Sequence, residues 1–358
     1  MSVIILSIDG GGIRGVIPAA ILDYLEKRVQ EKCNNNRIKI GELVDLVAGT
    51  STGSILGSLM LLPQGLPCDM TSENELDILK CRPKYSMEEI LQLYFELGND
   101  VFATSFFHNL RTLWGLMGPK YPDSNLTPPL LKLMDHYKLS DLIKPCMFTG
   151  YDIHARRAHF YTNLDKHKDY ANFYVKDVVR GSIAVPSFFS PAFFKDGPEE
   201  HTIIDGGIYA NNPSMCAYIE ASKTLINGSR EQLIERDPNN TVMISIGTGS
   251  AKQKPYTYKK SRRWGKAQWL LPVIDVMLTS SSEVVNYQMH RLYKAYDKEE
   301  NYFRLNPELR VASTSFNDAS DKNLSALLKD AKTWIDINKE ELEKVVCKIC
   351  ECKHVTSF

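Results

Sequence analysis

The chain has 358 residues, and its 43 lysines and arginines are balanced by 43 aspartates and glutamates. A main role in binding a nucleic-acid polymer is disfavoured, because neutralising phosphates requires a surplus of cations. With 43% hydrophobic and 24% charged residues, the composition is that of a globular protein and excludes a disordered or fibrous chain.

No segment predicts export or membrane insertion. The longest apolar stretches, residues 55–62 and 269–278, are shorter than the roughly 20 residues of a spanning helix. The N-terminal stretch lacks basic residues and reaches Asp9 after a few apolar ones, which is wrong for a signal peptide. We therefore expect a cytoplasmic protein.

The cysteines are too sparse for a disulfide scaffold, at eight in the whole chain. Cys347, Cys350, Cys352 and His354 cluster near the C-terminus, but they lack the distant second ligand pair that structural zinc sites usually have. We expect reduced thiols.

The predicted elements begin with a buried strand at residues 3–8, a glycine loop and a helix with apolar residues at every fourth position. A second apolar run, residues 43–48, is followed by another turn and another helical stretch from Ile55. Further strands are predicted at residues 145–151, 158–161, 202–204 and 241–246, and helices at 86–97, 175–184, 213–226, 264–292 and 324–346. This alternation predicts an α/β fold, a sandwich around a mostly parallel sheet.

The chain divides by pattern into two parts. Residues 1–250 are expected to form an α/β catalytic domain, and residues 251–358 a mainly helical extension packed on it. Residues 63–83 mix Pro, Gly, Ser and acidic residues without periodicity, which predicts a mobile insertion.

A glycine-rich loop, DGGGIRG at residues 9–15, follows the first strand. Glycines there allow a tight turn that points successive amides at one anion. Gly10, Gly12 and Gly15 match the dinucleotide-binding pattern, but the second strand does not end in the acidic residue that such a site requires. A Walker-type phosphate loop is excluded because no Gly-Lys-Ser/Thr follows. The remaining use is an oxyanion hole.

A second motif, GTSTG at residues 49–53, has the form G-x-S-x-G at a strand-to-helix turn. Flanking glycines relieve the strain of projecting a serine from such a turn, so Ser51 is the candidate nucleophile. A serine hydroxyl is a poor nucleophile unless a base accepts its proton and donors stabilise the oxyanion.

Two kinds of base are available. His290 and His354 follow the serine as a histidine base would, but His290 lies in an amphipathic helical stretch where a packed or surface histidine is expected. Asp205 ends a predicted strand and precedes two glycines. A carboxylate in a partly apolar site beside a serine can have a raised pKa and act as the base directly. Taken alone, Asp-Gly-Gly is also ordinary turn chemistry.

Taken together, these motifs resemble the patatin-like phospholipase family. The resemblance rests on residues 9–15, 49–53 and 205–207 in that order, and continues through VPSFF at 185–189, NNP at 211–213 and SIGTG at 245–249. Two departures are small: Ser54 stands where a third glycine is common, and GSIA at 181–184 replaces a more usual TSAA.

The resemblance implies a lipid acyl hydrolase of the phospholipase A type that needs neither metal nor cofactor. It implies Ser51 as nucleophile and Asp205 as base, working through an acyl-serine intermediate. It places the oxyanion hole at Gly10, Gly11 and Gly12, with the Gly11 and Gly12 amides as donors, and Arg14 supporting the loop.

The compact chain looks closest to bacterial members, some of which are anti-phage effectors activated by cyclic dinucleotides. The implied partners are a phospholipid membrane surface, on which the active enzyme sits peripherally, and a cyclic-dinucleotide activator, while a homodimer stays open. Residues 256–266 carry five cations and three aromatics, which suit phosphates, an anionic membrane or simply solvent. The aromatic residues 188–194 suit either an acyl channel or core packing.

Two rival functions remain: an acyltransferase or thioesterase that uses the same serine, and a ligand-binding or storage protein with secondary esterase activity.

Overall fold

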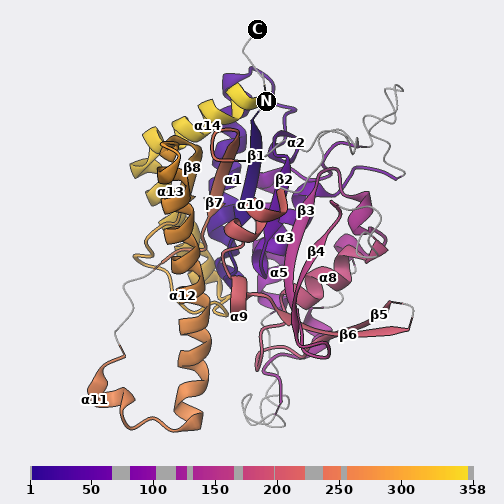
Figure 1. Cartoon of the computed structure of the whole chain (residues 1–358), viewed down its shortest axis with the longest axis vertical. Helices are drawn as coiled ribbons and strands as arrows, with labels where there is room; N and C mark the ends of the chain where they lie inside the picture. Colours follow the sequence, from indigo (N-terminus) through magenta and orange to yellow (C-terminus); the bar gives the residue numbers. More distant parts are fainter. Residues whose placement is uncertain are drawn as a thin grey trace.

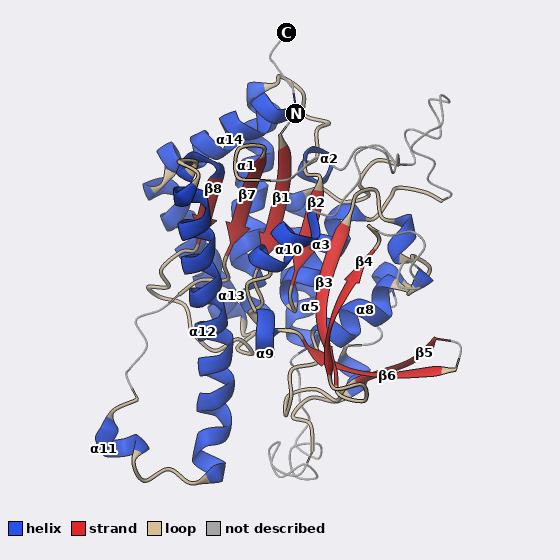
Figure 2. Ribbon diagram, in the orientation of Figure 1, coloured by secondary structure: helices blue, strands red, loops and turns tan. Residues whose placement is uncertain are grey.

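A computed structural model describes residues 2–66, 81–101, 118–126, 132–164, 172–196, 198–221, 237–250 and 256–353. Its centre is an eight-stranded sheet in the order β5-β6-β3-β2-β1-β7-β8, with β4 paired to β3 (Figure 2). The strands are β1 Val3–Ile8, β2 Leu46–Gly49, β3 Cys146–Asp152, β4 Arg157–Thr162, β5 Ala192–Asp196, β6 Glu199–Asp205, β7 Thr241–Ile246 and β8 Tyr302–Leu305.

The sheet is parallel from β3 through β2, β1 and β7 to β8, and antiparallel where β4 and β6 pair with β3 and β5 pairs with β6. Carboxyl ends of parallel strands meet at one edge of a sheet, which is where ligands bind in open α/β sheets. The loops after β1 and β2 therefore come together at this edge.

Helices of eight or more residues are α1 Val16–Lys32, α3 Thr52–Leu61, α5 Met87–Val101, α8 Val175–Ser182, α10 Ser214–Ala221, α12 Lys266–Ala295, α13 Asp321–Ile337 and α14 Lys339–Lys353. Shorter ones are α2 Ile40–Leu43, α9 Gly207–Ala210 and α11 Tyr258–Ser261, together with 3-10 turns at Gly12–Gly15, Asp123–Asn125, Leu139–Asp141 and Glu299–Asn301.

The helices cover both faces of the sheet, so the fold is a three-layer α/β sandwich. Alternation along β1 shows the two cores: Ile4 and Leu6 pack in a large core with α1, α3, α5, α8, α13 and α14, whereas Ile5 packs in a smaller core with α10 and α12. Strand side chains alternate between faces with period two, so both faces must be apolar for β1 to be buried throughout. The α/β sandwich expected from the sequence is confirmed.

The segment after residue 250 contributes more than helices. β8 pairs in parallel with β7 as the edge strand of the sheet, a strand that the hydrophobic pattern did not predict. α13 and α14 pack against α1. The helix predicted at 324–346 is two helices, because Asn338 ends α13 in a non-helical conformation with φ −108° and ψ 24°.

One part of the structure projects beyond the body. α11 and the N-terminal half of α12 extend past the carboxyl ends of the central strands, at the lower left of Figure 1. We call residues 256–278 the arm. No helix in the described ranges is long and apolar enough to cross a membrane.

The expected state of the cysteines needs one correction. Cys33, Cys146, Cys216, Cys347, Cys350 and Cys352 are free thiols, whereas Cys81 is disulfide-bonded. The number and spacing of the cysteines could not reveal this bridge. The insertion predicted at 63–83 lies largely outside the described residues, between Leu66 and Cys81.

Candidate active site

Ser51 stands on a strained turn between β2 and α3. Its φ of 54° and ψ of −120° lie in a region that non-glycine residues rarely adopt. Two hydroxyls hold the turn: the Ser51 amide donates to Ser182 Oγ at 3.0 Å, and Ser54 Oγ donates to the Ser51 carbonyl at 2.6 Å. A Cβ on Gly53 would lie 2.2 Å from the Ile8 carbonyl oxygen, so only glycine allows the helix to start this close to β1.

One residue that departs from the usual family pattern is thus part of the turn. Ser54 stands in place of a common glycine, and its hydroxyl donates to the Ser51 carbonyl. Ser182, which accepts the Ser51 amide, is the serine that GSIA shares with TSAA.

Asp205 ends β6 beside this serine. Its side chain is 2% exposed, accepts a hydrogen bond from the Ser51 side chain, and accepts a second from the Gly207 amide at 2.7 Å. Burial raises the pKa of Asp205 to about 7, although the two hydrogen bonds act to lower it. A carboxyl with this pKa is ionised in a large fraction of molecules near neutral pH and still basic enough to accept a proton.

The histidine candidates do not join this pair within the described residues. His290 is exposed on α12 and lines neither of the two cavities described below. His354 lies outside the described residues.

The glycine loop lies beside the serine, and its amides differ in what they contact. The Gly10 amide donates to the Asn211 carbonyl at 3.0 Å, so it is already engaged. Among the described residues, none accepts a hydrogen bond from the amide of Gly11 or Gly12. Gly12 has a φ of 58°, which points its amide in a direction that residues with a Cβ rarely allow. Gly11 and Gly12 therefore have amides available to an oxyanion.

A further donor was not singled out from the sequence. Thr52 is the first residue of α3, and the first amides of a helix have no acceptor within it. In G-x-S-x-G turns the amide after the nucleophile commonly belongs to the oxyanion hole. The position of Thr52 directly after the serine in G-x-S-x-G could therefore have identified it from the sequence.

The carbonyl of Gly10 anchors the loop. It accepts from Thr248 Oγ1 at 2.9 Å and from Asn211 Nδ2 at 3.3 Å. Thr248 belongs to the SIGTG stretch and Asn211 to the NNP stretch, which lie far apart in the sequence. Arg14 Nε donates to the Gly11 carbonyl at 3.4 Å.

An ion pair that the sequence did not predict lies directly before the glycines. Arg304 of β8 donates to both carboxylate oxygens of Asp9, at 2.9 and 2.6 Å, and also to Ser245 Oγ at 2.8 Å. Asp9 is 3% exposed, so its charge needs this partner. Arg304 is not part of a recognisable sequence motif, and it contacts Asp9 because β8 pairs with the sheet.

Two cavities lie beside the glycine loop, and the first of them is lined in part by Ser51. The first, of about 100 Å³, is lined almost wholly by apolar side chains next to Ser51, among them Ile55, Leu93, Val185 and Phe189. The second is a polar cavity of about 1280 Å³ between the glycine loop and the arm, and its lining includes Arg14 and Asp275. The aromatic stretch is accordingly divided, because Phe188 lines the polar cavity, Phe189 the apolar one, and Phe193 is 59% exposed.

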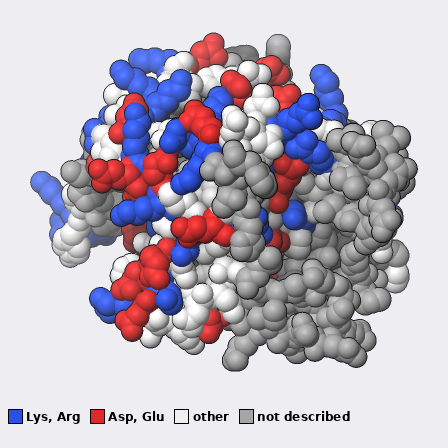
Figure 3. All heavy atoms as spheres, turned by 90° about the horizontal axis from the view of Figure 1, so that it is seen from above, with Lys and Arg blue, Asp and Glu red and all other residues white. Residues whose placement is uncertain are grey.

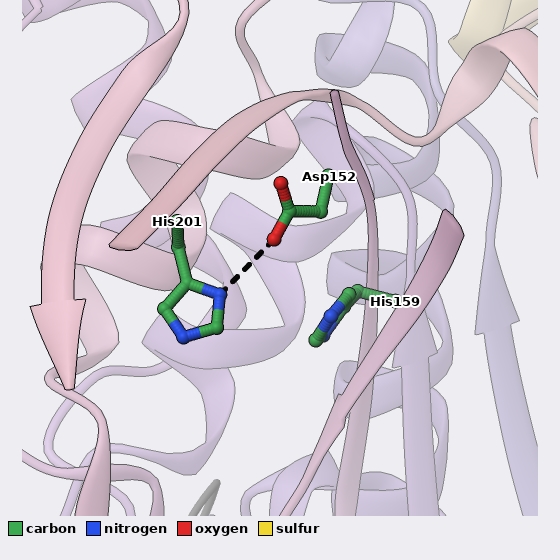
Figure 4. A group of neighbouring side chains, drawn as sticks. All are labelled: Asp152, His159 and His201. Carbon is green, nitrogen blue, oxygen red and sulfur yellow. Dashed lines mark hydrogen bonds and ion pairs between the residues drawn. The ribbon is translucent and has the colours of Figure 1, made fainter. Parts of the chain in front are cut away.

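A group of metal-ligand side chains lies elsewhere in the sheet. Asp152, His159 and His201 are buried within 4.8 Å of one another on β3, β4 and β6 (Figure 4). Asp152 already accepts from His201 Nδ1 at 3.1 Å and from two backbone amides of the following turn at 2.9 and 3.1 Å. Arg157 Nε donates to His159 Nε2 at 3.2 Å, and this cation would repel a metal ion. We interpret the group as a hydrogen-bonded junction between strands.

The combination of a strained serine, a buried carboxyl and a glycine loop at one edge of this sandwich matches a known family. The patatin-like phospholipase family model matches residues 6–218. The chain belongs to the patatin-like phospholipase family.

Patatin-like protein 2 of Oryza sativa subsp. indica is 29% identical over 361 residues, covering 95% of this chain and 85% of that protein. Patatin-like protein 1 of Arabidopsis thaliana is 30% identical over 345 residues, covering 91% and 80%.

Another relative, named Probable inactive patatin-3-Kuras 1, of Solanum tuberosum, is 28% identical over 348 residues, covering 91% of this chain and 84% of that protein. Family membership supports lipid acyl hydrolase activity, and whether a given member is active depends on its own site.

Proposed function

We propose that this protein is a phospholipase of the A type, which hydrolyses fatty-acyl esters of membrane glycerophospholipids through a Ser51–Asp205 dyad. The observation that carries the proposal is the hydrogen bond between the buried Asp205 carboxyl and the Ser51 side chain on its strained turn. Buried carboxyls with strongly raised pKa values cluster at catalytic sites, which favours a catalytic role for Asp205.

In the first half of the reaction, Ser51 Oγ attacks the ester carbonyl carbon while its proton passes to Asp205. The amides of Gly11 and Gly12, with that of Thr52, stabilise the oxyanion that forms. Collapse of this intermediate breaks the bond to the glycerol oxygen, which takes the proton from Asp205 and leaves as a lysophospholipid. The acyl chain remains on Ser51.

In the second half, water attacks the acyl-serine and gives a proton to Asp205. The same donors stabilise the second oxyanion, and its collapse returns the proton to Ser51 and releases a fatty acid. One carboxyl serves both steps, because it is protonated after each attack and deprotonated after each collapse.

The cavities support the choice of substrate. The apolar cavity opens beside Ser51 and suits a hydrocarbon chain, while the polar cavity on the other side of the glycine loop suits a head group. A substrate with one apolar and one polar end would place its ester between them, at Ser51.

The test compares wild-type protein with Ser51→Ala on phospholipid vesicles, with released fatty acid measured by mass spectrometry. Release that depends on Ser51 supports the proposal, and equal release from both proteins overturns it. A thioester substrate and an alternative acyl acceptor, run in parallel, distinguish a thioesterase or acyltransferase that uses the same serine.

The same assay tests activation. Parallel reactions contain a panel of cyclic dinucleotides, since the resemblance to anti-phage effectors implies such an activator. Release only with one nucleotide would make this a switched enzyme, whereas equal release without nucleotide would make it constitutive.

A further inference from the structure

The arm has two faces of different character. Its outer face carries Trp269, Leu270, Val273, Val276 and Met277, each between 37% and 48% exposed. At 3.6 residues per turn these positions occupy about 120° of the helix circumference. The opposite face lines the polar cavity, through Pro272, Ile274, Asp275 and Leu278. The outer face is therefore an apolar stripe that the body does not cover.

The tip of the arm adds aromatic rings. Trp264 packs edge-on against Tyr256 and against Trp269, with ring centroids 5.3 and 5.0 Å apart. Tyr258 is 78% exposed. Rings with an apolar body and a polar edge favour the boundary between membrane and water.

Cations surround these rings. The arm contains five basic residues and a single acid, Asp275, a net charge of about +4 in a chain whose total is zero. None of the five forms an ion pair with a residue that the structure describes. On the face seen in Figure 3, by contrast, basic and acidic side chains are interspersed. The basic residues of the arm are Lys259, Lys260, Arg262, Arg263 and Lys266.

We propose that the arm docks this enzyme on anionic phospholipid bilayers, with its outer face in the interface and its cations on the lipid phosphates. An uncovered apolar stripe combined with unpaired cations is the composition of segments that bind at the surface of anionic membranes. A second copy of the chain fits less well, because a symmetric contact through the arms would bring two segments of like charge together.

The arm's position connects docking to catalysis. It projects from the sheet edge that carries Ser51 and forms one wall of the polar cavity (Figure 1). Docking by the outer face would hold that cavity one helix diameter, roughly 10 Å, from the lipid surface. This step rests on the proposed function, whereas binding of the arm to a bilayer does not.

The experiment measures vesicle binding by co-sedimentation in a Ser51→Ala background, so that no lipid is consumed. Vesicles are phosphatidylcholine alone or phosphatidylcholine with phosphatidylglycerol, at low and high salt. One variant neutralises the tip, with Lys259, Lys260, Arg262 and Arg263 each changed to Gln. A second removes the stripe with Leu270→Gln, Val273→Gln and Val276→Gln, since Gln keeps helix propensity.

The matched control removes four exposed cations from α13 and α14, with Lys322, Lys329, Lys332 and Lys344 each changed to Gln. Every variant is also made with Ser51 intact and assayed on a water-soluble short-chain ester. That reaction needs no membrane, so its rate should equal that of wild type in all three variants.

We expect binding that requires phosphatidylglycerol and weakens at high salt. On vesicles that contain phosphatidylglycerol, neutralising the tip should weaken binding on the order of 10²–10³-fold. Removing the stripe should weaken binding to these vesicles at both salt concentrations, and the control should bind normally. Equal binding by all variants would overturn the proposal. A shift of the arm variants from dimer to monomer in light scattering, without a change in their vesicle binding, would also overturn it. If the ester is not hydrolysed by Ser51 while the arm still binds vesicles, the proposed function fails and the docking surface stands.

Discussion

Replacing Asp205 by Asn should make the protein more stable, and by an amount that depends on pH. Burial raises the pKa of the folded carboxyl from 3.8 to about 7, while the unfolded chain titrates near the ordinary value. Well below pH 3.8 both states are protonated, so the buried carboxyl carries no penalty. As pH rises from 4 to 7 the unfolded state ionises and the folded state does not, so stability falls until the folded carboxyl also ionises.

The size of this effect follows from the shift. About three pKa units at roughly 1.4 kcal/mol each give a penalty of about 4 kcal/mol above pH 7, and about 1 kcal/mol at pH 4.5. Asn cannot ionise, but its carbonyl oxygen can still accept from the Gly207 amide. We therefore expect Asp205→Asn to raise the free energy of unfolding by about 4 kcal/mol at pH 8.5 and about 1 kcal/mol at pH 4.5, with loss of esterase activity.

Urea unfolding at the two pH values measures the difference directly. The control is Asp336→Asn, at an aspartate whose side chain is 68% exposed in a surface ion pair, where the change should be small at both pH values. An equal gain from Asp205→Asn at pH 4.5 and 8.5, or a loss at pH 8.5, would refute the raised pKa on which the dyad mechanism depends.

The remaining predictions concern activity and the loop. The rate of hydrolysis of a soluble ester should rise with pH around a midpoint near 7, and it should fall about tenfold per pH unit below that midpoint as Asp205 is protonated. His290→Ala should leave this pH profile unchanged. A total loss of activity in a folded His290→Ala variant would favour a histidine base. Gly12→Ala should lower kcat by about 10²–10³-fold, because the new Cβ would lie 2.3 Å from the Phe316 carbonyl oxygen at a φ of 58°; an unchanged kcat would remove Gly12 from the oxyanion hole. Arg304→Ala should cost about 3–5 kcal/mol in urea unfolding by leaving a buried carboxylate unpaired, and Asp9→Asn in the same chain should recover much of it; a loss below 1 kcal/mol would show that the pair is not needed.

Local signals in the sequence predicted much of the fold. The strands at residues 3–8 and 241–246 occupy the same residues in the structure, because both are short, mostly apolar runs rich in β-branched residues. The turn at Ser51 was predictable because its glycines are local requirements of backbone geometry.

What the sequence could not show depends on distant contacts. β8 has only four residues and alternates between buried and half-buried positions, so its own pattern is too short to distinguish from a loop. β5 is part of the aromatic stretch that suited core packing equally well. Arg304 follows from β8, since nothing in its neighbourhood in the chain marks it as a partner of Asp9.

The same contacts bear on how the site is organised. The glycine loop is held at Asp9 by Arg304 of β8 and by Ser282 Oγ of α12, at 3.4 Å. Asn211, which anchors the Gly10 carbonyl, donates to Ser282 Oγ at 3.0 Å. Arg304 and Ser282 both come from beyond residue 250, so the C-terminal segment supplies groups that fix the position of the oxyanion loop. Because the arm includes the N-terminal half of α12, the proposed docking surface and Ser282, which contacts Asp9 and Asn211, lie on one helix.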